Sequence, residues 1–152
     1  MNLSVRHATL ADLATLVEFN VRLAKESENK TLDPQVVERG ILALFDDRSK
    51  GRYFVAEENG LIVGQAMVTY EWSDWRNAWI WWLQSVYTRQ SYRQKGVFRT
   101  LLRSIADAAQ QEGKVAGLRL YVEKDNTTAQ IAYRRCGFGD MPFRLMHLEI
   151  QP

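Results

Sequence analysis

The sequence predicts an α/β fold in which a mixed, mostly antiparallel sheet is flanked by about four helices. Two observations carry this prediction. Strand-like and helix-like patterns alternate in the order β-α-α-β-β-β-α-β-α-β, and the chain of 152 residues has the usual size of one domain. The central meander implies antiparallel neighbours, whereas the β-α-β-α-β half implies parallel strands joined by right-handed crossovers. We therefore expect residues 1–152 to form a single domain.

The first part of the chain is expected to form a short strand followed by two helices. The strand covers Ser4–Ala8. Thr9-Leu10-Ala11-Asp12 is a capping box, and apolar residues at helical spacing continue from it to about Glu26. A second helix begins with Asp33 as its N-cap and Pro34 in its first turn.

Three strand-like runs make up the centre of the chain. The runs Arg52–Glu57 and Leu61–Glu71 are joined through Asn59-Gly60, a pair typical of a two-residue hairpin turn. A tryptophan-rich connection leads to the third run, Ala78–Tyr87. These three runs predict an antiparallel meander.

The last part of the chain alternates helices with strands. An amphipathic helix is expected over Gly96–Glu112, and a strand over Leu118–Val122. Asn126 caps a further helix that ends at Gly137, and a final strand is expected near Leu145–Ile150.

Composition excludes several classes of protein. The chain is 46% hydrophobic with a formal net charge of +2, and no apolar run approaches the length of a membrane span. A single cysteine, Cys136, permits no internal disulfide and no thiol-based zinc site, which favours a cytoplasmic protein without a metal. The basic residues cluster locally, which indicates one anionic ligand rather than a nucleic-acid or membrane surface; they are Arg89, Arg93, Lys95, Arg99 and Arg103.

A basic turn lies between the third central run and the helix that follows it. There, unpaired N–H groups of the first helical turn, the helix dipole, Arg93 and Lys95 would converge on a phosphate or pyrophosphate. Gly96 would let the backbone approach that group closely. The chain has neither the G-x-x-x-x-G-K-[ST] nor the G-x-G-x-x-G spacing, so a nucleoside triphosphate or a dinucleotide is not expected. A solvated helix start remains the alternative interpretation.

Two motifs in sequence resemble the GNAT superfamily of N-acetyltransferases. The stretch Arg93-Gln-Lys-Gly96-Val-Phe98 is similar to that family's acetyl-CoA loop, although Phe98 stands where the family usually has Gly or Ala. The stretch Asn126-Thr-Thr-Ala129-Gln-Ile-Ala-Tyr133-Arg-Arg-Cys-Gly137-Phe138 resembles its second motif. The order of the elements matches the family fold across the chain. The N-terminal residues 5–12, with Glu18, Glu26 and Glu28, further resemble diamine and polyamine N-acetyltransferases.

The resemblance implies acetyl-CoA as the cofactor and assigns residues to it. In the family, the strand before the loop splays from its neighbour and exposes backbone N–H groups to the thioester carbonyl. The loop then holds the pyrophosphate, and the last helix contacts the pantetheine arm. On this sequence the implied cofactor-binding residues are Ser85, Val86, Tyr87, Arg93, Gln94, Lys95, Gly96, Val97, Phe98, Arg99, Asn126, Ala129 and Tyr133.

The reaction requires an acid and a base. A primary amine attacks a thioester only when it is neutral, yet it is mostly protonated at pH 7, and the thiolate leaves more easily beside an acid. The resemblance implies that Tyr133 is this acid. Gln84 falls where polyamine-acetylating relatives have a glutamate, and glutamine cannot accept a proton. Glu71 is therefore the first candidate base and Asp74 the second, with a solvated loop charge as the alternative for each.

The acceptor is predicted to be a small-molecule amine. All five tryptophans lie within residues 70–82 together with two carboxylates, and aromatic faces with carboxylates attract an ammonium group. The same tryptophans could instead pack the core or a subunit interface. Candidate substrate-binding residues are Glu26, Glu71, Trp72, Asp74 and Gln84.

Other functions remain open at this point. The same scaffold could acetylate an amino acid, an antibiotic or a peptide amine, because fold does not determine the acceptor. A non-catalytic acyl-CoA-binding sensor is a further alternative. A homodimer is expected from the resemblance and from the surplus of aromatic residues.

Overall fold

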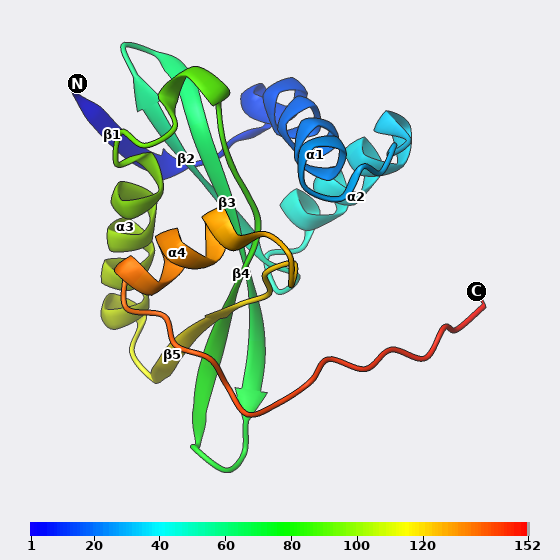
Figure 1. The fold of residues 1–152 in the computed structure, drawn as a ribbon, viewed down its shortest axis with the longest axis vertical. Helices are drawn as coiled ribbons and strands as arrows, with labels where there is room; N and C mark the ends of the chain where they lie inside the picture. The colour runs from blue at the N-terminus through cyan, green and yellow to red at the C-terminus, as the bar shows by residue number, and fades with distance from the viewer. Residues whose placement is uncertain (152) are drawn as a thin grey trace.

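The computed structural model describes residues 1–151, which form a five-stranded sheet with helices on both faces (Figure 1). The sheet order follows the chain, β1-β2-β3-β4-β5; the first three pairings are antiparallel and β4 runs parallel to β5. The elements are β1 Leu3–His7, η1 Leu10–Asp12, α1 Leu13–Glu28, α2 Pro34–Asp46, β2 Arg52–Glu58, β3 Leu61–Ser73, β4 Ala78–Thr88, η2 Gln90–Tyr92, α3 Val97–Glu112, β5 Val115–Leu120 and α4 Thr127–Arg135. The predicted fold class is confirmed.

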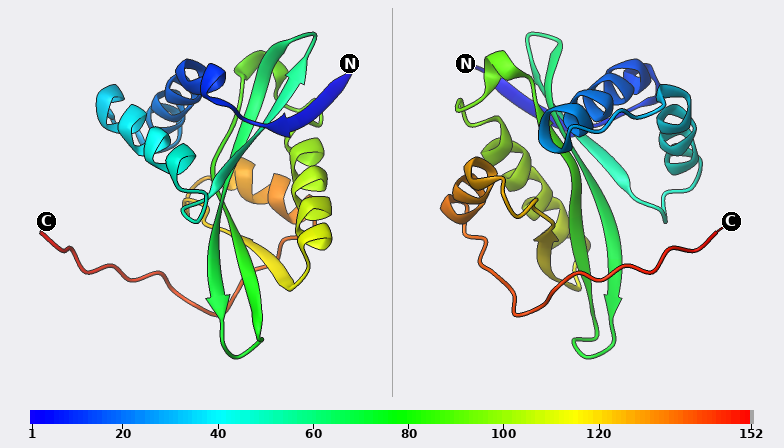
Figure 2. Two further views of the ribbon diagram at one scale, coloured as in Figure 1. Left: turned by 180° about the vertical axis from the view of Figure 1, so that it is seen from behind. Right: turned by 45° about the vertical axis from the view of Figure 1, so that its right-hand side comes forward.

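The helices form two layers, one on each face of the sheet (Figure 2). Helices α1 and α2 pack on one face over a buried cluster that includes Leu16, Phe19 and Tyr87. On the other face, α3 packs over a second cluster that includes Trp81 and Leu101, and α4 lies beside α3. None of the helices within residues 1–151 is long and apolar enough to cross a membrane.

Local signals at the starts of α1 and α2 and in the β2–β3 turn act as the sequence predicts, whereas β5 covers Val115–Leu120 instead of the predicted Leu118–Val122. The Thr9 and Asp12 capping box is formed, with η1 as the first turn ahead of α1. Asp33 accepts a hydrogen bond from the backbone N–H of Gln35 at 2.9 Å and so caps α2. Asn59 and Gly60 both have positive φ, 52° and 79°, the conformation that a type I′ hairpin turn needs.

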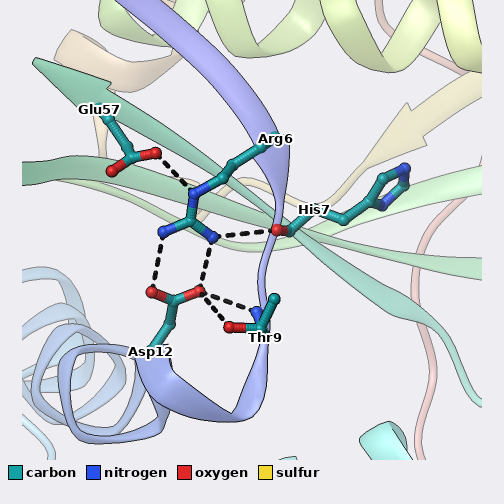
Figure 3. Close-up of polar contacts among 5 residues, drawn as sticks. All are labelled: Arg6, His7, Thr9, Asp12 and Glu57. Carbon is teal, nitrogen blue, oxygen red and sulfur yellow. Dashed lines mark hydrogen bonds and ion pairs between the residues drawn. The ribbon is translucent and has the colours of Figure 1, made fainter. Parts of the chain in front are cut away.

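A network of ionic contacts joins the N-terminal strand to its surroundings (Figure 3). The guanidinium of Arg6 donates to both carboxylate oxygens of Asp12, at 2.7 and 2.9 Å, and to Glu57 at 2.5 Å. Asp12 also accepts from the backbone N–H of Thr9 at 2.8 Å. One arginine therefore ties β1, η1 and β2 together.

The strand predicted at Leu145–Ile150 is absent as a paired strand from the described residues. The segment is extended but makes no ladder, and it runs away from the body of the molecule (Figure 1). The prediction was wrong for this single chain because alternation reports only how side chains divide between two faces. It does not report which edge would pair with them.

Candidate active site

The centre of the site is the point where β4 parts from β5. Their parallel pairing ends at Leu83 and Leu120, and the rest of β4 continues to Thr88 without β5 as a neighbour. The β3–β4 register shifts in the same region, and Ser85 has a φ of +52°. These features form a bulge that turns the backbone of β4 away from regular pairing.

A buried glutamine supports this bulge. The side-chain amide of Gln65 is fully buried and donates to the backbone carbonyl of Ser85 at 3.0 Å. Its carbonyl oxygen Oε1 has no protein partner within the described residues. The hydrogen bond from the Gln65 amide to Ser85 is a specific contact that holds the bulge in place. The unpaired, buried Oε1 costs free energy unless another donor reaches it.

The loop after β4 ends in a backbone cradle at the start of α3. Gln94 and Gly96 both have positive φ, 62° and 81°, on either side of Lys95. Because the sign of φ alternates along these three residues, successive N–H groups turn toward one side. The first turn of α3 adds N–H groups that have no partner in the helix. A Cβ added at Gly96 would meet no atom within 4 Å, so the space in front of this turn is open.

The basic side chains around the cradle differ in whether hydrogen bonds and ion pairs within the protein already hold them. Arg93 donates from Nε to the carbonyl of Thr88 at 3.0 Å and from Nη2 to Glu26 at 2.8 Å. The ammonium of Lys95 lies 5.5 Å from the ring centre of Tyr92 and makes no ion pair within the described residues. Arg93 is therefore committed to the protein, whereas Lys95 remains available to an anion.

Glu26 is held between two donors. Besides the contact with Arg93, its carboxylate accepts from the hydroxyl of Tyr87 at 2.7 Å. Partial burial acts to raise the pKa of Glu26, but these two hydrogen bonds outweigh it and hold the pKa below its usual value. Burial and the contact with Glu26 raise the pKa of Tyr87. Sequence reasoning placed Glu26 with the acceptor and Arg93 with the cofactor, whereas the structure joins the two side chains.

Helix α4 positions the candidate acid. The side chain of Asn126 accepts from the backbone N–H of Ala129 at 3.1 Å and so caps the helix. Further along, the ring of Tyr133 contacts Phe98 edge-on, with centroids 5.2 Å apart, and Phe138 at 6.0 Å. Burial raises the pKa of Tyr133 above 10.0, so its hydroxyl stays protonated at neutral pH.

Tyr133 faces a hollow of about 840 Å³ beside β5. The lining comes from β4, α3, β5, α4 and the chain that follows α4; it includes Trp82, Leu102, Leu120, Tyr133 and Phe138.

The start of α3 packs closely on β3. Val97 is buried there against Gly64 of β3. Only a glycine permits this close approach, because a Cβ at residue 64 would lie 2.6 Å from a methyl group of Val97.

The candidate base, Glu71, belongs to a second group of residues. This group lies on the face of β3 and β4 opposite to the face that α3 covers. Glu71 accepts from the indole N–H of Trp82 at 3.1 Å and lies 3.6 Å from Arg119. The ring of Trp82 stacks on Tyr121 with centroids 4.4 Å apart. Trp82, Arg119 and Tyr121 also line the hollow that Tyr133 faces, so Glu71 contacts two residues of its wall.

The structure separates the remaining predicted acceptor residues. Trp72 pairs across the ladder with Trp79, one position beyond Glu71, so it lies on the face opposite to Glu71. Asp74 lies in the turn of the β3–β4 hairpin, beyond the pair of Ser73 and Ala78, roughly 20 Å along β4 from Gln84. Gln84 donates to Thr69 at 2.7 Å on the face of Glu71.

Sequence reasoning missed three residues that shape the site. Arg119 and Tyr121 flank Glu71 and Trp82, and the pattern Leu118-Arg-Leu-Tyr121 does show the alternation of a half-buried strand, which would have pointed to them. The role of Gln65 under the bulge leaves no local signal, because it depends on a contact with the neighbouring strand.

Comparison with known proteins decides the family. The family model described as "Acetyltransferase (GNAT) family" matches residues 17–138. The chain belongs to the acetyltransferase (GNAT) family. The crystal structure of a possible acetyltransferase from Clostridium difficile 630 is similar over 100% of both chains, with 39% sequence identity and a TM-score of 0.91.

More distant structures share the fold of this GNAT protein. A predicted acetyltransferase with acetyl-CoA from Clostridium acetobutylicum has 18% identity and a TM-score of 0.79 over 97% of this chain and 96% of its own. Glucosamine-6-phosphate N-acetyltransferase from Arabidopsis thaliana has 15% identity and a TM-score of 0.74 over 97% and 99%. A search of curated proteins gave no match.

The GNAT protein is an acetyl-CoA-dependent N-acetyltransferase. Its residues fit such a ligand on two observations. The turn at Gln94–Gly96 is open in front of Gly96 and presents backbone N–H groups, as a pyrophosphate requires. Beyond the end of the β4–β5 pairing, the side of β4 that faces away from β3 has no neighbouring strand in the described residues, as an extended amide-containing arm requires.

Proposed function

We propose that this GNAT enzyme, acting as one domain, acetylates a primary amine of a small molecule, with diamines and polyamines as the first acceptor class. The observation that carries the proposal is that Tyr133 and Leu120, where the β4–β5 pairing ends, line one hollow, while Glu71 contacts Trp82 and Arg119 of its wall. An acid in the hollow and a base that contacts its wall suit direct attack of an amine on a thioester.

Acetyl-CoA supplies the acetyl group as a thioester when it is bound. The backbone N–H groups from Gln94 to Phe98, with the side chains of Lys95 and Arg99, bind its pyrophosphate. Arg93 contributes through its backbone, because its side chain is held by Glu26. The backbone around Ser85–Tyr87, displaced from regular pairing by the bulge, stabilises charge that develops on the carbonyl oxygen.

Two side chains move protons in the proposed reaction. Glu71, directly or through water, takes the proton that the ammonium group must lose before nitrogen attacks. As the new C–N bond forms and the C–S bond breaks, the hydroxyl of Tyr133 gives its proton to the departing sulfur. Burial keeps that proton on the tyrosine at neutral pH, which is the state that the role requires.

The acceptor class is supported by the wall around Glu71. Trp82 stacks on Tyr121, and a cationic amine with methylene groups binds well to aromatic faces beside a carboxylate. Arg119 shares that carboxylate and so limits the number of positive charges that the wall attracts. A diamine or a polyamine that presents one terminal amine fits this balance.

The test is thiol release from acetyl-CoA by the purified protein across four amine classes: polyamines, lysine analogues, amino acids and N-terminal peptides. We expect release with diamines or polyamines, lowered by about a hundredfold or more in Tyr133→Phe while acetyl-CoA still binds. The matched control is Tyr70→Phe, which removes a hydroxyl that accepts from Arg52 away from the hollow. Release with amino acids or peptides alone would replace the acceptor class, and full activity in Tyr133→Phe would remove Tyr133 as the acid.

A further inference from the structure

Gln65 is a polar residue in an apolar layer of the core. It faces Val55 of β2 and Tyr87 of β4 across the sheet, and directly opposite residues place their side chains on one face. Val55 and Tyr87 belong to the buried cluster on the face that α1 and α2 cover (Figure 2). Gln65 is 0% exposed, and its Oε1 has no hydrogen-bond partner among the described residues. The amide therefore lies within an apolar layer with one polar atom unpaired.

The unpaired oxygen of Gln65 sets this position apart from the rest of the core. A buried acceptor without a donor costs free energy, whereas an apolar side chain of the same length carries no such cost. Natural proteins depart from local preferences of this kind mainly at functional or strained positions. Within the described residues, the side chain makes one hydrogen bond, to the backbone carbonyl of Ser85 at 3.0 Å. The reason for an amide here therefore lies at that contact.

The contact falls on the strained residue of the β4 bulge. In the β3–β4 register, the single residue Ala66 faces two residues of β4, Ser85 and Val86. Ser85 has a φ of +52°, a left-handed backbone conformation that is unfavourable for a residue with a Cβ. The hydrogen bond to its carbonyl holds this conformation, so the shape of the bulge depends on the Gln65 amide.

The carbonyl of Ser85 and the N–H of Val86 belong to one peptide group. The group is planar and trans, so its C=O and N–H point in opposite directions. Because the C=O is turned toward Gln65, the N–H of Val86 points away from it. The ladder gives the same direction. The N–H of Arg89 donates to the carbonyl of Val63 on β3 at 2.8 Å, and backbone groups alternate between the two sides of a strand, so those of Val86 point away from β3.

The side of β4 that faces away from β3 is where the thioester lies in the proposed function. The pairing of β4 with β5 ends at Leu83 and Leu120, so Val86 has no strand beside it on that side in the described residues. When the amine nitrogen adds to the thioester carbon, the C=O π pair moves onto the oxygen, and it returns as the C–S bond breaks and the thiolate leaves. A backbone N–H aimed at that oxygen stabilises charge that exists only during the transfer.

We propose that Gln65 is a positioning residue of the acetyl transfer, because its amide holds the Ser85 carbonyl and so aims the N–H of Val86 at the thioester oxygen. This role rests on the proposed function, since it requires the thioester of acetyl-CoA to lie beside β4 where the pairing with β5 has ended. Gln65 then acts on kcat and not on the binding of the cofactor, whose pyrophosphate lies at the turn Gln94–Gly96.

The test compares Gln65→Met with Val55→Ala. Methionine keeps the length of the side chain and removes both the N–H donor and the unpaired oxygen. Val55→Ala, the matched control, truncates the residue opposite Gln65 in the same apolar layer and removes no hydrogen bond. Steady-state kinetics of the full chain, with an amine that the unchanged enzyme acetylates, gives kcat and the KM for acetyl-CoA, and urea unfolding gives the stability.

The kinetic result expected for Gln65→Met is a fall in kcat of about tenfold or more, with a KM for acetyl-CoA within about twofold of the unchanged value. Its urea midpoint should lie at or above that of Val55→Ala, because the unpaired acceptor is lost together with the donor. Val55→Ala should keep its kcat within about twofold despite its lower stability. An unchanged kcat in Gln65→Met, or an equal fall in Val55→Ala, would overturn the proposal.

A second measurement needs no acceptor amine. NMR spectra of the isotope-labelled chain follow the amide proton of Val86 with CoA and with acetyl-CoA, which differ by the acetyl group and its carbonyl. We expect a downfield shift that acetyl-CoA causes and CoA does not, and that is lost in Gln65→Met. This result in a chain that acetylates none of the amines would support the role of Gln65 and refute only the acceptor class. The absence of a shift specific to acetyl-CoA would overturn the role of Gln65.

Discussion

The ring of Phe98 contacts the ring of Tyr133 edge-on, with centroids 5.2 Å apart and planes at 66°. Phe98 stands in the first turn of α3 and Tyr133 near the end of α4, so this pair fixes the distance between the cofactor turn and the candidate acid. The large side chain at this position of the loop therefore points toward α4 and leaves the open side of the turn to the backbone.

Phe98→Ala should remove this support for Tyr133. We expect a loss of about 2 kcal/mol in the free energy of unfolding and a fall in kcat of about tenfold or more, because the hydroxyl loses its fixed place. Urea unfolding and steady-state kinetics check both values. Ile131→Ala, on the exposed face of α4, is the matched control, and an unchanged kcat in Phe98→Ala would contradict the positioning role.

The pH dependence of the rate should reflect the burial of Tyr133. Burial raises the pKa of its hydroxyl above 10.0, so the acid form persists through neutral and moderately alkaline pH. We expect no fall in kcat that depends on Tyr133 at neutral and moderately alkaline pH. The measurement compares the pH profile of the unchanged enzyme with that of Tyr133→Phe; an alkaline decline near pH 8 that the variant lacks would contradict it.

Gly96 and Gly60 form a natural pair for testing the cradle. Their φ angles are 81° and 79°, and a Cβ at either would meet no atom within 4 Å. Alanine at each should therefore cost about 1 kcal/mol from the left-handed backbone alone. Only Gly96→Ala should also raise the KM for acetyl-CoA, because its Cβ would occupy the space in front of the turn. Equal KM values in the two variants would place the pyrophosphate elsewhere.

The sequence predicted those parts of the fold that rest on local chemistry. The turn at Asn59-Gly60, the cap at Asp33 and the cap at Asn126 each need only a few neighbouring residues, and each is present. Contacts between distant segments were not predictable in this way. The bond between Glu26 and Arg93 joins α1 to the loop before α3, and no spacing within either segment reports it. The prediction of a final strand was wrong for a related reason, because the pattern of a segment does not specify which sheet edge it pairs with.

The commitment of Arg93 to Glu26 gives a prediction about the basic side chains. Lys95→Ala should raise the KM for acetyl-CoA about fivefold, more strongly at low salt, because its ammonium makes no ion pair within the described residues. Arg93→Ala should change that KM less and lower stability by up to about 1 kcal/mol, since it removes a partly exposed ion pair. Initial rates at two salt concentrations, with thermal unfolding of each variant, separate the effects. A larger KM change in Arg93→Ala would show that its side chain leaves Glu26 to bind the cofactor.

The Arg6–Asp12 contact gives a prediction about stability in acid (Figure 3). The hydrogen bond from Arg6 is the largest cause that lowers the pKa of Asp12 below 3.8, against the opposing effect of burial. A lowered carboxyl pKa stabilises the fold fully above pH 3.8, and this contribution is lost as the pH falls through the lower, folded value. Asp12→Asn should therefore cost about 2 kcal/mol near pH 6.

The decisive quantity is the difference in unfolding free energy between the unchanged chain and Asp12→Asn, measured by urea unfolding from pH 6 to pH 2. It should stay constant down to about pH 4 and shrink below that value, because protonation of Asp12 removes what the substitution removes. Asp140→Asn is the matched control, since Asp140 is exposed and contacts only Arg134 among the described side chains, and it should change stability by less than about 0.5 kcal/mol. A difference for Asp12→Asn that stays constant to pH 2 would show that Arg6 does not hold Asp12 in its charged form.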